Sequence, residues 1–543
     1  MKSTRSLAIL AVLTFAVTER AATASDAPLR AGDRVEATLA AGEVRPFPLE
    51  AAPGDFVQGN LEKGRGRLAL IDAAGGRERV LVEEDGRREF LFVSGDRGPY
   101  SLELRAGEAG PFVLKVERIV PLAAQVKPKE VLESPRLRRL QETLAAGGGT
   151  DEFWGEVERG RGPVIETEEV EPPLADGQAL VTFVWRGARR GVRLFGAPSN
   201  DFDDLKRLGD SDVWFGSYRV PRTARVTYKY APDVPELDAS PMVRRRAILA
   251  TAQRDPFNPK HLPEGEPTDK YAGESLLELP DAPPCPWLDR KDGVPTGSVE
   301  RLPLASTILG NTRDVWVYRP HGYTPGADGN ALLVLFDGER YMDEVPTPRI
   351  LDNLIAAGAI PPTAAVLVGN PTSESRSAEL PPNPKFARFL AEELTPWARE
   401  RGVHAPASAT VVAGASYGGL AAAYAGFAHP EIFGKVLSQS GSFWWAPGSS
   451  PAAEPDEPEW LARQVAKAPA VRVVFHFQAG TFEVGRGGSA GIRQTSQHLR
   501  DVLEAKGCIA SYADFGGGHG YAYWRYTLAD GLIKLLGRPV PAP

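Results

Sequence analysis

One five-residue motif, Gly414-Ala415-Ser416-Tyr417-Gly418, constrains what this chain can fold into more than any other feature of the sequence. It fits the pattern G-x-S-x-G, in which a serine stands on a sharp turn between a strand and a helix. The β-branched run Thr410-Val411-Val412-Ala413 leads into the motif, and the Ala-rich stretch from Leu420 to Phe427 follows it. The sequence therefore predicts a strand, a tight turn that exposes Ser416 as a nucleophile, and a helix.

A second match to the same pattern, Gly487-Gly488-Ser489-Ala490-Gly491, shows that the pattern alone is not specific. The chain contains 56 glycines, so a match by chance is not surprising. The second match lies in a glycine-rich loop, several residues after the nearest predicted strand ends. Its context is that of a flexible loop before a helix, and we assign the nucleophile to Ser416 rather than to Ser489.

The rest of the chain divides into an α/β part and two β-rich parts. Residues 291–543 alternate strand-like and helical runs, which indicates an α/β domain with a mainly parallel sheet. Residues 26–125 and 161–290 carry short alternating runs between turn residues, typical of small β-sandwiches, and a charged helical linker, residues 126–160, joins them. The predicted fold class is α/β: a C-terminal α/β-hydrolase domain preceded by two β-sandwich-like domains.

A nucleophilic serine needs a base, and the base needs an acid that orients it. In the α/β-hydrolase fold the chain order is serine, acid, histidine, so only histidines after Ser416 are candidates. His519 lies in Gly516-Gly517-Gly518-His519-Gly520, directly after the predicted strand Ile509 to Phe515, and we predict it as the base. The sequence contexts of the others favour packing or surface positions: His429, His476 and His498.

The acid is expected on the loop after the preceding strand. The run Val471 to Phe477 reads as that strand, and Glu483 follows it in the segment Gln478-Ala479-Gly480-Thr481-Phe482-Glu483. We predict Glu483 as the acid. Asp514, within or just after the last predicted strand, is the alternative that the sequence leaves open.

The oxyanion of such an attack needs backbone N–H donors. We expect one from Tyr417, the residue after the nucleophile. The other is expected from Gly338 or Glu339, in the loop after the run Leu332 to Phe336, because that run stands where an α/β-hydrolase places its third strand. Serine-histidine-acid chemistry requires no metal and no cofactor, and we expect none.

The first residues read as a secretory signal peptide, residues 1–25. Lys2 and Arg5 supply positive charge, Leu7 to Val17 is an apolar run, and Ala22-Thr23-Ala24 is a small-residue cleavage site. No later run is long and apolar enough to span a bilayer, so we expect a periplasmic or secreted protein without a stable membrane span.

Charge and cysteine content exclude other classes. Acidic residues outnumber basic ones by 70 to 63, the formal charge is −7, and no long basic run occurs, so a nucleic-acid binder is not expected. The chain has 2 cysteines, Cys285 and Cys508, too few for a disulfide scaffold. Their separation leaves open whether they pair in an oxidising compartment.

Several short motifs within Arg313 to Arg525 agree in order, spacing and flanking residues with one known family. The stretch resembles the enterochelin (ferric enterobactin) esterases, and the second β-rich region is similar to the N-terminal domain of that family through Trp185-Arg186, Asp212-Val213-Trp214 and Asp255 to Pro259. The motifs of the main stretch are Leu335-Phe336-Asp337-Gly338, Arg376-Ser377-Ala378-Glu379-Leu380, Gly414 to Gly419, Leu437-Ser438-Gln439-Ser440-Gly441-Ser442-Phe443-Trp444-Trp445, Ala479-Gly480 with Glu483, Gly517-Gly518-His519 and Trp524-Arg525.

The resemblance implies a serine esterase that opens the ester bonds of a catecholate trilactone siderophore such as (ferric) enterobactin through an acyl-enzyme. Ser416 would attack the ester, His519 would act as base and then as acid, and Glu483 would orient His519. The substrate would be a small-molecule ester, with iron arriving only as part of a ferric siderophore.

The resemblance also implies substrate contacts. Arg376 would bind the anionic catecholate, since a guanidinium suits a ligand with several negative charges; the alternative is a structural ion pair with Glu379. Trp444 and Trp445 would line an aromatic pocket, and the alternative for both is core packing.

Two other functions remain open at this point. Related hydrolases act on feruloyl or acetyl esters of polysaccharides, and residues 26–125 would then serve as a docking module. These residues resemble the pre-peptidase C-terminal type of β-sandwich through Ala51-Ala52-Pro53-Gly54-Asp55 and Gly98-Pro99-Tyr100-Ser101-Leu102, and contain no catalytic motif. A binding protein with a silent hydrolase domain is the third possibility, and the complete set of catalytic residues argues against it.

Overall fold

The computed structural model describes residues 27–125, 132–196, 198–199, 201–449, 457–485 and 490–537, together with the backbone of residues 21–23. The chain forms two compact units, Met1–Glu130 and Val131–Pro543. The predicted signal peptide, residues 1–25, lies outside the described residues except for the short strand β1 (Ala21–Thr23). Residues 486–489, which include Ser489, also lie outside them.

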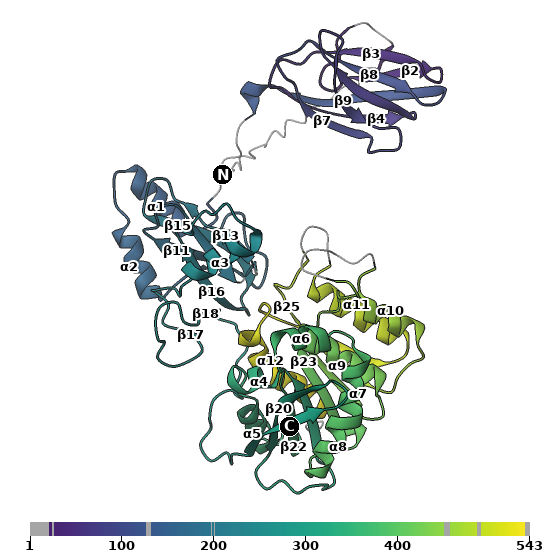
Figure 1. Ribbon diagram of the computed structural model, residues 1–543. Helices are drawn as coiled ribbons and strands as arrows, with labels where there is room; N and C mark the ends of the chain where they lie inside the picture. The colour runs from purple at the N-terminus through teal and green to yellow at the C-terminus, as the bar shows by residue number, and fades with distance from the viewer. Residues whose placement is uncertain are drawn as a thin grey trace, which may run out of the picture. The chain divides into compact units, whose positions relative to one another are not determined.

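The first unit is a β-sandwich with its own hydrophobic core. One sheet has the strand order β1-β2-β9-β4-β7 and the other β3-β8-β5-β6 (Figure 1). Alternate side chains point into the space between the sheets, as along β2, where Val35, Ala37 and Leu39 are buried. The strands are β2 (Arg34–Leu39), β3 (Val44–Leu49), β4 (Phe56–Lys63), β5 (Gly66–Ile71), β6 (Arg77–Val82), β7 (Glu89–Val93), β8 (Tyr100–Ala106) and β9 (Gly110–Val120).

The second unit opens with two helices, α1 (Pro135–Ala145) and α2 (Asp151–Gly160). The hydroxyl of Ser134 accepts a hydrogen bond from the N–H of Leu137, which satisfies a donor that the first turn of a helix leaves free. The apolar faces of both helices form one core cluster with residues of strands β11 and β15. Residues 132–160 of the predicted linker therefore pack as part of the second unit.

The β domain that follows has two sheets that enclose an aromatic-rich core, which includes Phe183, Tyr228 and Tyr230. The strand orders are β10-β11-β15-β14 and β13-β12-β16-β18-β17. The elements are β10 (Val164–Glu166), β11 (Gln178–Arg186), β12 (Val192–Gly196), β13 (Asp201–Asp204), β14 (Lys206–Arg207), β15 (Val213–Pro221), β16 (Arg225–Pro232), α3 (Pro241–Thr251), β17 (His261–Leu262) and β18 (Glu274–Glu278).

The C-terminal domain is built on an eight-stranded sheet of order β19-β20-β22-β21-β23-β24-β25-β26. The pairs β19–β20 and β20–β22 are antiparallel, and the others are parallel. The strands are β19 (Ser298–Ser306), β20 (Asn311–Arg319), β21 (Ala331–Phe336), β22 (Thr363–Val368), β23 (Thr410–Ala415), β24 (Lys435–Gln439), β25 (Val474–Gly480) and β26 (Ile509–Phe515).

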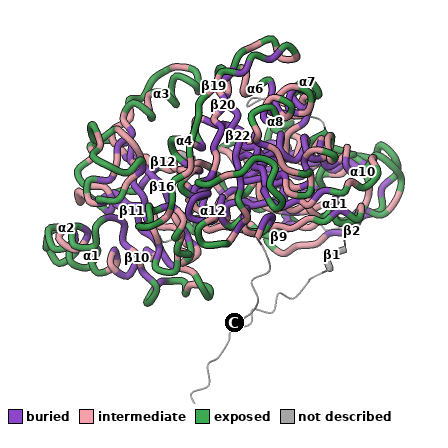
Figure 2. Tube along the Cα trace, turned by 90° about the horizontal axis from the view of Figure 1, so that it is seen from below, coloured by how far each residue is buried: buried purple, intermediate pink, exposed green. Residues whose placement is uncertain are grey.

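Helices cover both faces of this sheet. Alternate residues of β21 enter two different core clusters, Leu332, Val334 and Phe336 in one and Leu333 and Leu335 in the other, as a strand buried on both faces requires. Buried residues follow the strands of this sheet, whereas α3 is mostly exposed (Figure 2). The helices are α4 (Gly338–Asp343), α5 (Thr347–Ala356), α6 (Ser373–Glu379), α7 (Pro384–Arg388), α8 (Thr395–Glu400), α9 (Tyr417–Ala428), α10 (Trp460–Lys467), α11 (Ile492–Ala505) and α12 (Tyr521–Leu536).

This architecture confirms the predicted fold class, an α/β-hydrolase domain preceded by two β domains. The two cysteines are free thiols, and Cys508 belongs to the core cluster on one face of the sheet while Cys285 packs against the cluster on the other face. Within the described residues, no helix is long and apolar enough to cross a membrane.

Candidate active site

Ser416 stands on the strained turn between β23 and α9. Its backbone has φ 56° and ψ −122°, a conformation that side-chain-bearing residues rarely adopt and that is held only by surrounding structure. A Cβ atom on Gly414 would lie 2.5 Å from the carbonyl oxygen of Gly418, and one on Gly419 would lie 2.6 Å from Ser438 Oγ. Close approach of β23, α9 and β24 therefore explains why glycine occupies these positions.

The structure brings Ser416, His519 and Glu483 together at the carboxyl edge of the sheet. His519 Nε2 lies 3.1 Å from Ser416 Oγ, and His519 Nδ1 lies 2.5 Å from Glu483 Oε1. Glu483 is buried. A carboxylate at Nδ1 fixes the tautomer in which Nε2 is free to accept the serine proton, so this geometry suits a serine nucleophile with a histidine base.

The carboxylate of Glu483 is held by two further donors on its other oxygen. Oε2 accepts hydrogen bonds from the N–H of Gly480 at 2.5 Å and from Ser440 Oγ at 2.7 Å. Trp524 Nε1 donates to Ser440 Oγ at 2.9 Å, which leaves the Ser440 proton directed at the carboxylate. Ser440 and Trp524 lay inside motifs of the family resemblance, but nothing in the sequence assigned them this role.

Asp514, the alternative acid, is engaged elsewhere. Arg493 contacts it with two nitrogens, Nε to Oδ1 at 2.9 Å and Nη2 to Oδ2 at 2.6 Å, and the hydroxyl of Tyr512 also donates to it. Partial burial favours the neutral acid, but these hydrogen bonds outweigh it and lower the pKa of Asp514. The geometry therefore favours Glu483 over Asp514 as the partner of His519.

The predicted oxyanion donors lie at the starts of two helices. Tyr417 is the first residue of α9 and Gly338 is the first residue of α4, where backbone N–H groups have no acceptor within the helix. The two helices follow β23 and β21, which are neighbours in the sheet, and a Cβ on Gly418 would lie 3.3 Å from Asp337 Oδ2. Tyr417, Gly338 and Glu339 remain predicted donors.

Arg376 forms an ion pair, but not with the partner considered in the sequence analysis. Its Nε lies 2.6 Å from Asp337 Oδ1 and its Nη2 lies 2.8 Å from Asp337 Oδ2. Glu379 instead pairs with Arg313 at 2.8 Å, so the alternative considered for Arg376, an ion pair with Glu379, is wrong, while its contact with a catecholate stays a prediction. Burial disfavours the charge of the guanidinium, but the bonds to Asp337 outweigh it and raise the pKa of Arg376.

The two tryptophans after β24 have different surroundings. Trp445 is half-buried and packs against the core of the sheet, with its ring 6.2 Å from that of Trp460; that it lines an aromatic pocket stays a prediction. Trp444 is also half-buried, and its ring lies 6.2 Å from that of Tyr417, the residue after Ser416. Ser442, which sequence reasoning did not single out, places its Oγ 3.4 Å from Ser416 Oγ.

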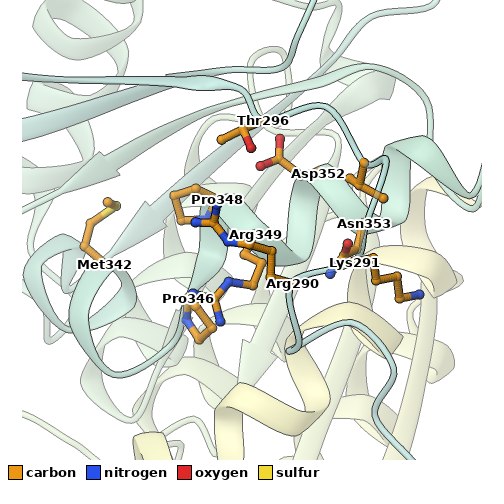
Figure 3. A pocket seen from close by; sticks show the side chains of 10 residues that line it. Arg290, Lys291, Thr296, Met342, Pro346, Pro348, Arg349, Asp352 and Asn353 are labelled. Atoms are coloured by element: carbon orange, nitrogen blue, oxygen red, sulfur yellow. The ribbon is translucent and has the colours of Figure 1, made fainter. Parts of the chain in front are cut away.

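A pocket of about 210 Å³ opens between the segment before β19 and helices α4 and α5 (Figure 3). None of the residues that line it belongs to the Ser416, His519 and Glu483 set, so it is separate from the candidate active site. The lining residues are Arg290, Lys291, Val294, Thr296, Met342, Pro346, Pro348, Arg349, Asp352 and Asn353. No group of acidic, histidine or cysteine side chains suited to a metal ion occurs in the described part of the chain.

Two family models match the second unit. Residues 180–288 match the family "Enterochelin esterase, N-terminal", and residues 306–535 match the family "Putative esterase". The first of these regions is the β domain, and the second contains the candidate active site. Neither match reaches the first unit.

Several similar proteins align with this chain over nearly the whole of their own length. The iron(III) enterobactin esterase of Dickeya dadantii is 30% identical over 432 residues, which is 72% of this chain and 93% of that protein. The iron(III) salmochelin esterase of Escherichia coli O6:H1 is 30% identical over 417 residues, 73% of this chain and 97% of that protein. The structure of the enterobactin esterase of Shigella flexneri in the presence of enterobactin matches with a TM-score of 0.55 at 28% identity, over 71% of this chain and 98% of that one. The chain therefore belongs to the enterochelin (iron(III) enterobactin) esterase family.

Proposed function

We propose that this protein is a serine esterase that hydrolyses the ester bonds of a catecholate trilactone siderophore such as (ferric) enterobactin. The proposal rests on two contacts of His519 in a chain of the enterochelin esterase family. Its Nε2 lies 3.1 Å from Ser416 Oγ, and its Nδ1 lies 2.5 Å from Glu483 Oε1. Relatives named as enterobactin and salmochelin esterases support the substrate class.

The geometry suggests how acylation proceeds. His519 Nε2 accepts the hydroxyl proton of Ser416 while Oγ attacks the ester carbonyl carbon, and Glu483 stabilises the imidazolium that forms. The oxyanion accepts hydrogen bonds from the N–H of Tyr417 and from that of Gly338 or Glu339. When the C–O bond breaks, His519 returns its proton to the leaving alkoxide, and the substrate acyl group remains on Ser416.

Deacylation repeats the same proton transfers with water. His519 takes a proton from a water molecule as its oxygen attacks the acyl carbon, and then gives that proton to Ser416 Oγ as the bond to the enzyme breaks. The products are a carboxylic acid and the free serine. The iron of a ferric siderophore takes no part in these bond changes and is written as part of the substrate.

We also propose that the protein works in the periplasm or outside the cell. The support is the predicted signal peptide, with a charged start, the apolar run Leu7 to Val17 and the cleavage site Ala22-Thr23-Ala24. Fractionation of cells that express the full chain, followed by N-terminal sequencing, tests this. A mature chain that starts near Ser25 or Asp26 supports export, and uncleaved protein in the cytoplasm contradicts it.

Product analysis by liquid chromatography and mass spectrometry tests the substrate class. Enterobactin and ferric enterobactin are compared with methyl ferulate and acetylated xylan, using wild type, Ser416→Ala and, as a matched control from the second sequence match, Ser489→Ala. We expect linear siderophore products from wild type and Ser489→Ala, and a loss of at least about 10³-fold in Ser416→Ala. Turnover of the ferulate or xylan esters alone would replace the siderophore proposal with the polysaccharide one.

A further inference from the structure

The loop that carries His519 has little rigidity of its own. Four of the five residues in Gly516-Gly517-Gly518-His519-Gly520 are glycines, and glycine leaves the backbone more conformational freedom than any other residue. A catalytic base, however, has to be held to within about 0.5 Å of its working position. Support for His519 must therefore come from outside the loop.

The β domain touches the first residue of this loop directly. The backbone N–H of Arg225, the first residue of β16, donates a hydrogen bond to the carbonyl oxygen of Gly516 at 2.7 Å. A Cβ on Gly516 would lie 2.8 Å from Ala224 Cα and 2.8 Å from the carbonyl oxygen of Thr223. The loop is thus pressed against the turn before β16, and glycine is required at position 516 because of that contact.

Tyr523 supports the loop from its other end. It is the third residue of α12 and is buried in the core of the β domain. Its hydroxyl oxygen accepts hydrogen bonds from the backbone N–H of Thr227 at 2.9 Å and from Thr227 Oγ1 at 3.1 Å, both on β16. A Cβ on Gly517 would lie 2.6 Å from Cδ1 of the Tyr523 ring, so the ring lies directly against the loop.

The loop of the acid is tied to the same support. The N–H of Thr481 donates to the carbonyl oxygen of Phe515 at 2.9 Å, and the N–H of Phe482 donates to that of Gly517 at 3.1 Å. The Phe482 side chain packs against the core of the β domain. The His519 loop therefore rests on β16 and the turn before it, and the Glu483 loop is bonded to the His519 loop and packs against the core of the β domain.

We infer that the β domain, through β16 and the turn before it, holds the His519 loop in its working position, with Gly516 and Tyr523 as positioning residues. This inference rests on the proposed serine esterase function. The β domain then contributes to the chemical step itself, beyond any part in binding a substrate, because a displacement of about 1 Å in a catalytic group can cost about 10²-fold in rate.

Two substitutions disturb this support without touching a reacting atom. Gly516→Ala introduces a methyl group between the loop and the turn before β16, and Tyr523→Phe removes the hydroxyl that bonds to Thr227. The matched control is Gly191→Ala in the same domain, because a Cβ on Gly191 would meet no atom within 4 Å. Hydrolysis of p-nitrophenyl acetate gives kcat and KM, and titration with a fluorophosphonate counts the active sites.

We expect kcat per titrated site to fall about 10- to 100-fold in Gly516→Ala and about 3- to 10-fold in Tyr523→Phe, with KM within about twofold of wild type. Gly191→Ala keeps wild-type values. A merely structural role would instead lower the melting temperature and the number of titrated sites, with an unchanged rate per site.

The outcomes separate the inference from the proposed function. If wild type hydrolyses the ester and both variants keep kcat per site within about twofold, the inference is overturned and the esterase proposal stands. If wild type is inactive, or Ser416→Ala is fully active, the proposed function itself fails. Should Gly516→Ala not fold, Tyr523→Phe decides the question by the same criteria, since it keeps the buried ring.

Discussion

The position of Glu483 depends on residues that lie far from it in sequence. Ser440, directly after β24, donates to one carboxylate oxygen, Trp524 of α12 donates to Ser440 Oγ, and His519 contacts the other carboxylate oxygen. At the residue scale, these hydrogen bonds favour Glu483 as the acid of the candidate triad, whereas Asp514 forms an ion pair with Arg493.

Exchanging each acid for its amide tests whether Glu483 or Asp514 is the partner of His519. Glu483→Gln loses the acceptor that fixes the tautomer of His519, so we expect kcat to fall about 10³- to 10⁴-fold. Asp514→Asn, the matched control, breaks only a partly exposed ion pair, and we expect kcat within about threefold of wild type. The measurement is steady-state hydrolysis of a p-nitrophenyl ester, and a larger loss in Asp514→Asn than in Glu483→Gln would reverse the assignment.

Arg376 offers a second test at this scale. Because it is bound to Asp337, next to the predicted oxyanion donors, we expect Arg376→Met to lower kcat for small neutral esters by about 10-fold, as well as turnover of the siderophore. A role only in binding the anionic catecholate would leave p-nitrophenyl acetate hydrolysis unchanged and raise KM for the siderophore alone. Kinetics on both substrates distinguish the two roles.

At the scale of elements, local sequence patterns predicted strands, turns and helices, whereas several contacts between residues far apart in the chain could not be predicted. The strand β23, the turn at Ser416 and the helix α9 followed from sequence because the turn permits few residue types. The roles of Ser440 and Asp337 did not, because they depend on which strands become neighbours: β24 lies beside β25, and β21 beside β23. The sequence could not predict that Trp444 lies beside Tyr417 and Trp445 beside Trp460, since these contacts also depend on how the chain folds.

The turn Asp255 to Asn258 is held by a contact with a strand distant in sequence, and we expect a pH effect on stability from it. The hydroxyl of Tyr228 donates to Asp255 Oδ2 at 2.7 Å, and Asp255 is buried. Burial raises the pKa of Asp255 from 3.8 to about 6. The folded state therefore holds a proton that the unfolded state has lost between about pH 4 and pH 6, so stability from this group falls as pH rises through that window.

Asp255→Asn removes this titration. Relative to the variant, wild type should lose up to about 3 kcal/mol of unfolding free energy between pH 4 and pH 7, which is the value of a shift of about two pKa units. Urea unfolding of both proteins at several pH values measures the difference. A difference between the two proteins that does not change with pH would contradict the account of Asp255.

At the scale of the whole molecule, each part carries its own core. The sandwich, the β domain and the two faces of the hydrolase sheet form separate clusters of buried apolar side chains. Both cysteines are free, so burial of apolar surface rather than a disulfide stabilises the fold. The candidate active site is built entirely from the second unit.

Deleting residues 26–125 from the mature chain should therefore leave the chemistry intact. We expect kcat and KM for p-nitrophenyl acetate within about twofold of the full mature protein, because the removed sandwich has a complete core and supplies no residue to the triad. Melting curves verify that the shortened protein is folded. A loss of activity above about 10-fold in a folded protein would show that the sandwich contributes to the site.

The central claim is that Ser416 is acylated by a trilactone siderophore. Rapid mixing with enterobactin, acid quench within milliseconds and mass spectrometry of the digested protein measure this directly. The account predicts the peptide that contains Ser416 with the mass of the ring-opened substrate attached, and neither adduct nor turnover in Ser416→Ala. Turnover of enterobactin that persists in Ser416→Ala, without an adduct on that peptide in wild type, would contradict it.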